Sequence, residues 1–345
     1  MSKIRERGED IRQFILMQVN NHSTDIVALV IKEFGITRQS VNKHIKVLVE
    51  KKSLITKGNT RNKSYHLHPL ASWIKKYSLA NKLEEDRVWD IDIKSLISDL
   101  PSNVKDIWYY AFTEMVNNAI DHSSGQEMII SVTRTEAETE ILISDNGEGI
   151  FKKIQRELEL HDESHAVLEL AKGKLTTDPA RHSGQGIFFT SRMFDRFVII
   201  SGNTIFSHEF DKVEDFIVEP TVPHAATTIL MKLTNNTLRT SKQIFDQYSS
   251  GDDYAFTKTV VPVRLAQYGD EKLVSRSQAK RLLVRVDRFK KVILDFSGVE
   301  IIGQAFADEV FRVFRNQHPE IELISIHETQ DVRQMIRRAE THSIG

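Results

Sequence analysis

The sequence predicts an α/β multidomain protein, mixed α+β in class, with units at residues 1–70, 71–235 and 250–345. A length of 345 residues suits two or three domains of ordinary size. Strand-like and helix-like patterns alternate through the second and third units. The charge is also uneven. Residues 1–68 carry 13 Lys+Arg and 6 Asp+Glu, or 13 − 6 = +7, so the remainder carries −8 of the total of −1. This asymmetry favours a basic module on a more acidic body.

Composition excludes several classes of protein. No run of 18 or more apolar residues occurs, so we expect no transmembrane helix and no membrane partner. The first residues, MSKIRERGEDIRQF, lack the apolar core of a signal peptide. The absence of cysteine excludes disulfides, thiolate zinc sites and a cysteine nucleophile. A cytoplasmic location fits these features.

The first unit predicts three helices and a basic hairpin. Apolar periodicity marks helices over IRQFILMQV and DIVALVIKEFG, and Thr37 is a plausible N-cap for a third over ITRQSVNKHIKVLVEKKSL. The outward residues of this third helix combine amides and guanidinium for base edges with ammonium groups for phosphates: Arg38, Gln39, Ser40, Asn42, Lys43 and Lys46. LITKGNTRNKSYHLH predicts a hairpin with a Gly-Asn turn and basic flanks at Lys57, Arg61 and Lys63.

This helical pair followed by a hairpin resembles the winged helix-turn-helix of bacterial regulators. The resemblance covers about 65 residues and implies that the unit binds double-stranded DNA. DNA readers of this class often dimerise to bind two half-sites, so we expect a homodimer. A basic protein-interaction module is the alternative.

The second unit is expected to begin with helices and to continue as alternating strands and helices. Its stretch EMVNNAIDH, residues 114–122, predicts a helix with a polar stripe. At about 100° per residue, Glu114, Asn118 and Asp121 share one side, with Asn117 beside them. An ordinary amphipathic helix with a solvated face also explains this stretch taken alone.

Three further stretches carry glycines or polar residues where strands and helices meet. In ETEILISDNGEGIF, Asp145 stands at a strand end before Gly147 and Gly149. In RHSGQGIFFTSRMFD, Gly184 and Gly186 open a helical pattern, whose first N–H groups suit an anion. HAATTILMKL predicts a late strand beginning near Thr227. No Walker A sequence occurs, which excludes a P-loop site.

The order and spacing of these four stretches resemble the Bergerat α/β sandwich, the ATP-binding fold shared by gyrase, Hsp90, histidine kinases and MutL (GHKL), over about residues 90–235. The resemblance implies ATP and Mg²⁺ as cofactors. Asn118 matches the asparagine that holds Mg²⁺, an ion that an amide oxygen suits. Glu114 matches the general base of the hydrolysing members. The resemblance also implies that Asp145 accepts the adenine amino group, that Gly147 and Gly149 let the chain pass the base, that Thr227 lies near the adenine, and that Gly184, Gln185 and Gly186 offer N–H groups to phosphate. Asp121 and His122 are also explained as surface residues of the helix.

Within this superfamily, LTTDPARHSGQGIFFTSRMFD resembles the lid and second glycine box of the anti-sigma-factor serine kinases. The resemblance implies a phosphate contact for Arg181, although an exposed loop arginine is equally compatible. Ile187-Phe188-Phe189 stand where that glycine box often continues with more glycine. The helices before Glu114 lack a histidine followed by an acidic residue, so the phosphoacceptor of a histidine kinase is absent.

The polar stretches at 234–243 and 247–253 predict a linker to the third unit. There, KKVILDFSGVEIIGQAFADEVFRVF and PEIELISIH predict strands followed by helices. This unit resembles the STAS-like domains of anti-sigma antagonists, which implies a docking surface for a protein partner. Gln304 and Ala305 stand where those antagonists carry a phosphorylated serine. Ser275 and Ser277 are weaker candidates, which helix capping also explains.

Three functions fit these patterns. The first is a DNA-binding transcriptional regulator controlled by ATP and Mg²⁺. The second is a protein serine/threonine kinase of the anti-sigma type, or a slow ATPase, for which Glu114 supplies the base. The third is a scaffold that uses ATP only for assembly.

Overall fold

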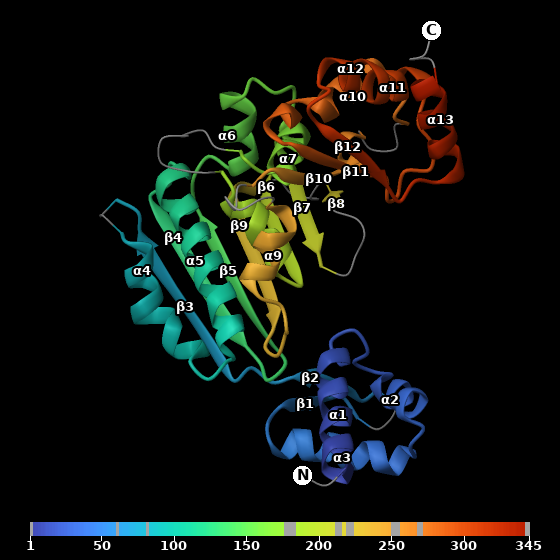
Figure 1. Ribbon diagram of the computed structural model, residues 1–345. Coiled ribbons are helices and arrows are strands. Elements are labelled where there is room, and N and C mark those ends of the chain that lie inside the picture. The colour runs from blue at the N-terminus through green and yellow to red at the C-terminus, as the bar shows by residue number, and fades with distance from the viewer. Residues whose placement is uncertain are drawn as a thin grey trace.

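The computed structural model describes residues 3–59, 62–80, 83–175, 184–210, 216–218, 224–249, 256–267 and 272–341 of the protein. Figure 1 shows three units in chain order: a small helical unit, a central unit on a large sheet, and a C-terminal unit beside the far end of that sheet. This mixture of helices and sheets confirms the predicted α/β multidomain class.

The N-terminal unit consists of three helices and a hairpin: α1 (Lys3–Gln18), α2 (Ile26–Phe34), α3 (Arg38–Glu50), β1 (Leu54–Lys57) and β2 (Ser64–Leu67). The two strands pair in antiparallel fashion. Thr37 caps α3 as predicted, since its Oγ1 accepts the N–H of Ser40 at 3.3 Å. Val41, Ile45 and Leu48 form the inner side of α3 and belong to a separate hydrophobic core. The predicted third helix and hairpin are therefore confirmed as elements of structure.

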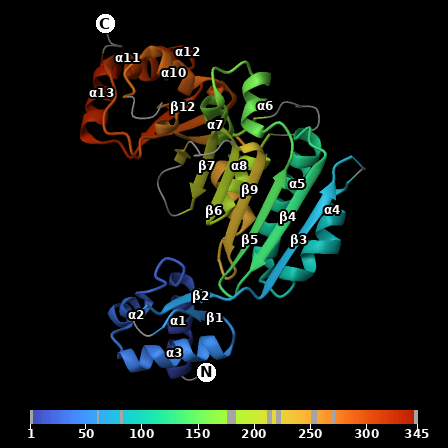
Figure 2. The ribbon, with the colours of Figure 1, turned by 180° about the vertical axis from the view of Figure 1, so that it is seen from behind.

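The central unit is built on one antiparallel sheet. Its described strands lie in the order β3-β4-β5-β9-β6-β7-β8. They span β3 (Ala71–Ser78), β4 (Glu127–Arg134), β5 (Glu138–Asp145), β6 (Arg196–Gly202), β7 (Thr204–Glu209), β8 (Phe216–Val218) and β9 (His224–Thr234). The predicted late strand therefore begins at His224, slightly before Thr227. Figure 2 shows the face of this sheet that lies away from α5.

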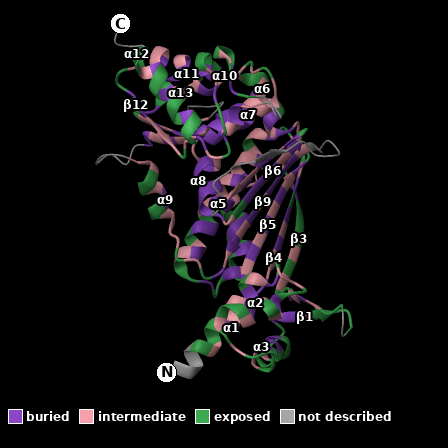
Figure 3. Ribbon diagram, turned by 90° about the vertical axis from the view of Figure 1, so that its right-hand side faces the viewer, coloured by how far each residue is buried: buried purple, intermediate pink, exposed green. Residues whose placement is uncertain are grey.

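Helices cover the other face of the sheet, where α5 (Ser102–His122) runs along the strands (Figure 1). The remaining helical segments of this unit are α4 (Glu85–Val88), η1 (Trp89–Ile93), η2 (Lys94–Ile97), α6 (Ile150–Glu157), α7 (Glu163–Lys172), α8 (Gly186–Met193) and α9 (Ser241–Tyr248). Buried residues concentrate between α5 and the strands (Figure 3). Trp108 and Phe112 of α5 are fully buried in this core.

The C-terminal unit has a parallel sheet in the order β10-β11-β12. Its elements are β10 (Lys258–Pro262), η3 (Val263–Ala266), α10 (Arg276–Leu283), η4 (Val286–Arg288), β11 (Lys291–Asp295), α11 (Gln304–Asp308), η5 (Glu309–Phe314), α12 (Arg315–Gln317), β12 (Glu322–Ile326) and α13 (Gln330–Thr341). Ser275 and Gln278 form a capping box at the start of α10, which confirms the capping interpretation of Ser275. Gln304 is the first residue of α11.

The central unit begins with a strand, so the prediction of helices at its start was wrong. Residues Ala71–Ser78 pair with β4 along their whole length. The two consecutive lysines, Lys75 and Lys76, interrupt the alternation of apolar and polar residues by which a strand is predicted from sequence. Lys75 and Tyr77 lie on one face of the strand and share the partner Asp92. The Lys75 Nζ donates to its carboxylate at 2.7 Å, and the Tyr77 hydroxyl donates to it at 2.8 Å.

The predicted linker contains a helix, α9. Thr240 caps it, since Thr240 Oγ1 accepts the N–H of Gln243 and Gln243 Oε1 accepts the N–H of Thr240. Phe245 of this helix packs against the rings of Tyr110 and Phe189, at centroid distances of 5.2 and 4.7 Å. Its neighbours are mostly polar, so composition indicated a loop while a few aromatic residues fix the helix in place.

The N-terminal unit contacts the turn between β4 and β5. Asn20 Nδ2 donates to Glu138 Oε1 at 2.7 Å, and the Ser53 hydroxyl donates to the Glu136 carboxylate. Ala137 of the turn packs into the N-terminal hydrophobic core. Residues 68–70 alone separate β2 from β3. The N-terminal unit is therefore joined to the sheet by the chain itself and by these contacts.

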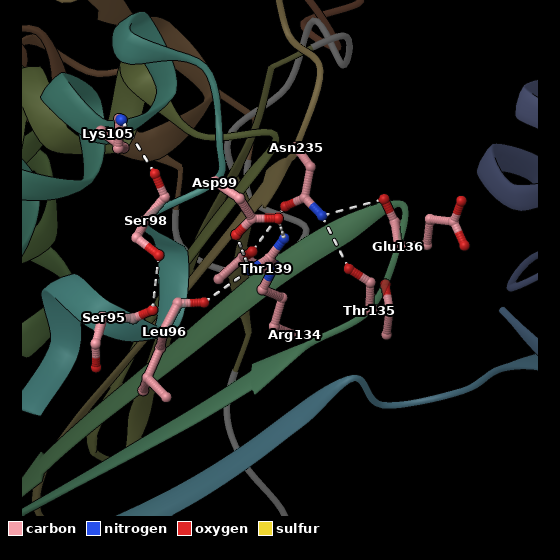
Figure 4. Close-up of polar contacts among 10 residues, drawn as sticks. All are labelled: Ser95, Leu96, Ser98, Asp99, Lys105, Arg134, Thr135, Glu136, Thr139 and Asn235. Carbon is pink, nitrogen blue, oxygen red and sulfur yellow. Dashed lines mark hydrogen bonds and ion pairs between the residues drawn. The ribbon is translucent and has the colours of Figure 1, made fainter. Parts of the chain in front are cut away.

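Asn235 holds the same turn from the inside (Figure 4). Its side chain is 2% exposed. Its Nδ2 donates to the carbonyls of Thr135 and Glu136 at 2.9 and 3.2 Å, while its Oδ1 accepts the Thr139 hydroxyl at 2.7 Å. Arg134, just before the turn, donates to the Asp99 carboxylate at 2.6 Å. The turn that receives the N-terminal unit is thus fixed by the hydrogen bonds of the buried Asn235 side chain.

The C-terminal unit packs against the end of α7. Lys172 is 1% exposed, and its Nζ donates to Glu169 at 2.6 Å and to the carbonyl of Val284 at 2.7 Å. Burial lowers the pKa of Lys172, which the Glu169 carboxylate opposes. Thr259 donates its hydroxyl to the carbonyl of Lys172. One continuous hydrophobic core includes residues of both units. The third unit is therefore fixed to the second.

Every helix in the described part of the chain is too short or too polar to cross a bilayer.

Candidate functional site

The C-terminal half of α5 lines a cavity of about 500 Å³, within the range of about 300–1,000 Å³ for small-molecule sites. Glu114, Asn117, Asn118 and His122 all border it. The predicted polar stripe therefore faces a cavity, with one correction. Asp121 is exposed to solvent and is not part of the cavity lining, which fits a surface residue of the helix.

Glu114 lies at the junction between α5 and α8. A side chain at Gly186, the first residue of α8, would overlap the Glu114 carboxylate. Gly186 thus permits the carboxylate to lie against the start of that helix. Tyr110, one turn before Glu114, has its pKa raised by burial and by the nearby Glu114 charge. An ionised Glu114 at a helix start is electrostatically favourable.

Asp145 ends β5 at the wall of the cavity. It is buried, with 9% of its surface exposed. Burial raises the pKa of its carboxyl, while hydrogen bonds from the N–H of Gly147 at 2.8 Å and from Thr227 oppose that rise. Thr227 also borders the cavity, and its hydroxyl accepts the N–H of Ile150 at 3.0 Å. A buried carboxylate that lines a cavity is suited to accept a hydrogen bond from a ligand.

The turn after Asp145 needs its glycines for different reasons. A side chain at Gly147 would overlap the carbonyl oxygen of Ser123, so the turn packs directly on the end of α5. Gly149 has a φ of 92° and immediately precedes α6. Both residues shape the wall, although neither is itself among the residues that line the cavity.

The stretch of residues 184–186 is divided between two surfaces. Gly184 and Gly186 border the main cavity, and Gly184 has a φ of +67°. Gln185 instead lines a second hollow, between α8 and α9, together with Phe189 and Phe245. Phe188, which borders the main cavity, packs 4.6 Å from the ring of Phe256 before β10. Arg181 lies outside the described residues, as does Arg61 of the hairpin.

Sequence reasoning missed Lys153 and the apolar walls. Lys153 borders the cavity from α6, and its Nζ donates to the carbonyl of His122 at 2.9 Å. Isoleucines from four strand and helix positions form apolar walls, which suit a flat ring: Ile143, Ile150, Ile154 and Ile229. The helical spacing of Ile150 and Ile154 was the available signal for α6, but it does not show which lysine faces inward.

The donor set fits a metal that arrives with its ligand. Among the described residues, no group of three or more His, Cys, Asp or Glu side chains could hold a metal ion. The cavity instead offers the amides of Asn117 and Asn118. Mg²⁺ keeps several waters and usually combines one or two protein ligands with substrate phosphates, so Asn118 with a polyphosphate would suffice.

Comparisons with protein families agree with this geometry. Residues 62–205 match the model of the histidine kinase-like ATPase domain, and residues 278–334 match the STAS-like domain of unknown function (DUF4325). The chain therefore contains a GHKL-type ATPase domain, a class that binds ATP and usually Mg²⁺, followed by a STAS-like domain. The first match includes the cavity residues from α5, β5 and α8, and the second runs from α10 into α13. A search of curated proteins found no match.

Proposed function

We propose that the protein is a DNA-binding transcriptional regulator controlled by ATP and Mg²⁺. One observation carries the proposal. Strand β5 ends with Asp145 in the cavity, and it begins with Glu138, which Asn20 of the basic N-terminal unit contacts. A ligand on Asp145 and the N-terminal unit therefore act on opposite ends of one strand. The seven steps of strand from Glu138 to Asp145 span about 23 Å, so the two sites are separate but lie on one continuous strand.

The surface of α3 supports DNA as the partner. The resemblance to a winged helix-turn-helix implies that this helix enters a major groove. Arg38, Gln39, Asn42, Lys43 and Lys46 are all exposed, as a reading surface requires. Ser40 is half-buried at the cap, and Lys57 and Lys63 are exposed on the hairpin. We propose a homodimer as the form that binds two half-sites.

ATP can control DNA binding only if it favours one arrangement of the units over another. The STAS-like unit is placed to sense or set that arrangement, because Phe188 borders the cavity and also packs on Phe256. A protein partner that binds the STAS-like unit would thereby influence the nucleotide site. The same contact between Phe188 and Phe256 would transmit the nucleotide state to the STAS-like unit and its partner.

The test is DNA binding by wild type and by Asp145→Asn, with and without ATP–Mg²⁺, at one fixed salt concentration because phosphate contacts make affinity salt-dependent. We expect ATP to change the affinity of wild type and to leave the variant unchanged. DNA binding by both proteins regardless of ATP would refute nucleotide control. No binding of any duplex under either condition would refute the DNA-binding function.

A second candidate is a protein serine/threonine kinase of the anti-sigma type. The observation in its favour is Glu114, a carboxylate held beside Gly186 where a general base would orient a hydroxyl or a water. Transfer of labelled phosphate from ATP to a protein would establish this activity. Release of inorganic phosphate alone would indicate an ATPase, which is compatible with the regulator.

A further inference from the structure

Lys153 is held in a fixed position at the cavity wall. It lies on α6, with 16% of its side chain exposed. Its Nζ donates to the carbonyl of His122, the last residue of α5, at 2.9 Å, whereas the Glu157 carboxylate is 3.9 Å away. An ammonium has three N–H donors, and the bond to His122 uses one of them. The side chain is therefore oriented by a backbone group, with further donors available at the cavity.

The charge balance of the cavity makes this ammonium important. The described lining includes two carboxylates, Glu114 and Asp145, and Lys153 is its only lysine or arginine. A polyanion placed in a half-buried cavity beside two carboxylates loses hydration and meets repulsion, so it needs a compensating cation. Charge-assisted hydrogen bonds from lysine to phosphate supply that compensation.

The point at which Lys153 meets α5, its last residue His122, indicates which part of the ligand the ammonium meets. Glu114, Asn118 and His122 follow one another at intervals of four residues, or about 6 Å along the helix. The proposed ATP site puts the base at Asp145, the metal at Asn118 and the terminal phosphate near Glu114. Lys153 bonds to His122, one helical turn past Asn118, so its ammonium lies beyond the metal on the side away from the terminal phosphate. We propose that Lys153 binds the first phosphate of the nucleotide, the one attached to the ribose. This inference rests on the proposed ATP site.

The alternative role is purely structural, because a cation that bonds a terminal carbonyl stabilises the end of a helix. Three variants separate the roles. Lys153→Met removes both the charge and the bond to His122. Lys153→Gln keeps an N–H donor for the carbonyl and removes the charge. Lys152→Met removes a neighbouring charge from the exposed side of the same helix and is the matched control.

The experiment is competition of adenosine, AMP, ADP and ATP against a fluorescent ATP analogue, with each full-length variant. We expect Lys153→Met and Lys153→Gln to lower the affinity for AMP, ADP and ATP by about tenfold, which is the effect of losing one charge-assisted hydrogen bond. Adenosine should stay within about twofold of wild type, and Lys152→Met should match wild type for every ligand. Lys153→Arg should recover most of the affinity.

Equal weakening of adenosine by Lys153→Gln would overturn the proposal in favour of the structural role. Weakening confined to ATP would place the ammonium at the terminal phosphate and would overturn the assignment to the first one. Unchanged affinity for all four ligands would exclude any contact. If wild type itself binds none of them, the proposed nucleotide function fails, which is a different result from failure of Lys153 alone.

Discussion

The carboxylate of Glu114 occupies the space that a Cβ atom at Gly186 would fill. Gly186 begins α8 without a positive φ, so its lack of a side chain serves this contact and not an unusual backbone angle. The general-base candidate is thus positioned by the residue that also begins a wall of the cavity.

Replacing Gly186 with Ala should displace Glu114. We expect ATP turnover or phosphate transfer to fall by about tenfold or more, since small errors in the position of a catalytic group are costly. Gly8→Ala is the control, because its added methyl group would meet no atom closer than 3.6 Å. Phosphate release by the two variants checks the prediction, and equal rates would contradict it.

Glu114→Gln should separate binding from chemistry. The amide keeps the size of the carboxylate but cannot accept a proton, so we expect the rate of any hydrolysis or transfer to fall by about 10²–10⁴-fold. ATP affinity should stay within about threefold of wild type. Single-turnover measurements at saturating ATP test this, and an undiminished rate would show that another group serves as the base.

Asp145 should lower the stability of the ligand-free protein at neutral pH. Its pKa in the folded state is raised, mainly by burial, so folding disfavours its charged form. Asp145→Asn should therefore raise the melting temperature at pH 7. The gain should shrink as pH falls through the folded pKa and vanish below the unfolded pKa, where both states carry the proton. Thermal melts across pH test this, and a gain that persists at low pH would contradict it.

Asn235→Ala should weaken the joint that receives the N-terminal unit. The change leaves the Thr139 hydroxyl, the buried carbonyl of Thr135 and the half-buried carbonyl of Glu136 without their partner, which costs about 2–4 kcal/mol. Asn21→Ala, at an exposed position, is the control. Denaturant melts measure the loss. If β5 transmits the nucleotide state, DNA binding by the folded variant should also respond less to ATP. An unaltered response would show that this turn does not carry the effect of ATP to the N-terminal unit.

The cavity could be predicted from sequence where chemistry fixes both residue type and spacing. Glu114 and Asn118 are one turn apart on a helix, and Asp145 stands at the end of a strand that alternates cleanly, so their places on these elements follow from local pattern. Their meeting in one site was implied only by the resemblance of the four stretches, in order and spacing, to the ATP-binding fold. The second glycine pair was predicted as a unit, but only the structure shows that Gln185 faces a different hollow.

Other features depend on contacts between distant residues. Strand β3 is specified by its pairing with β4 and by Asp92, and α9 by the rings of Tyr110 and Phe189. Lys153 enters the cavity because a carbonyl at the end of α5 bonds its ammonium, while the adjacent Lys152 is exposed. No local periodicity distinguishes the two lysines, so the sequence alone could not.

The short connection at residues 68–70 has a geometric consequence for the proposed dimer. A hydrogen bond from Leu70 N to Arg134 O, at 2.7 Å, holds even this link to β4, which limits how far the proposed recognition helix α3 can move relative to the sheet. The separation of two such helices would be set by the protein alone. An operator with about five extra base pairs between its half-sites would present the second site on the opposite side of the duplex, out of reach. Adding about ten base pairs would return the second half-site to the same side of the duplex, but the two half-sites would then be farther apart than the two helices.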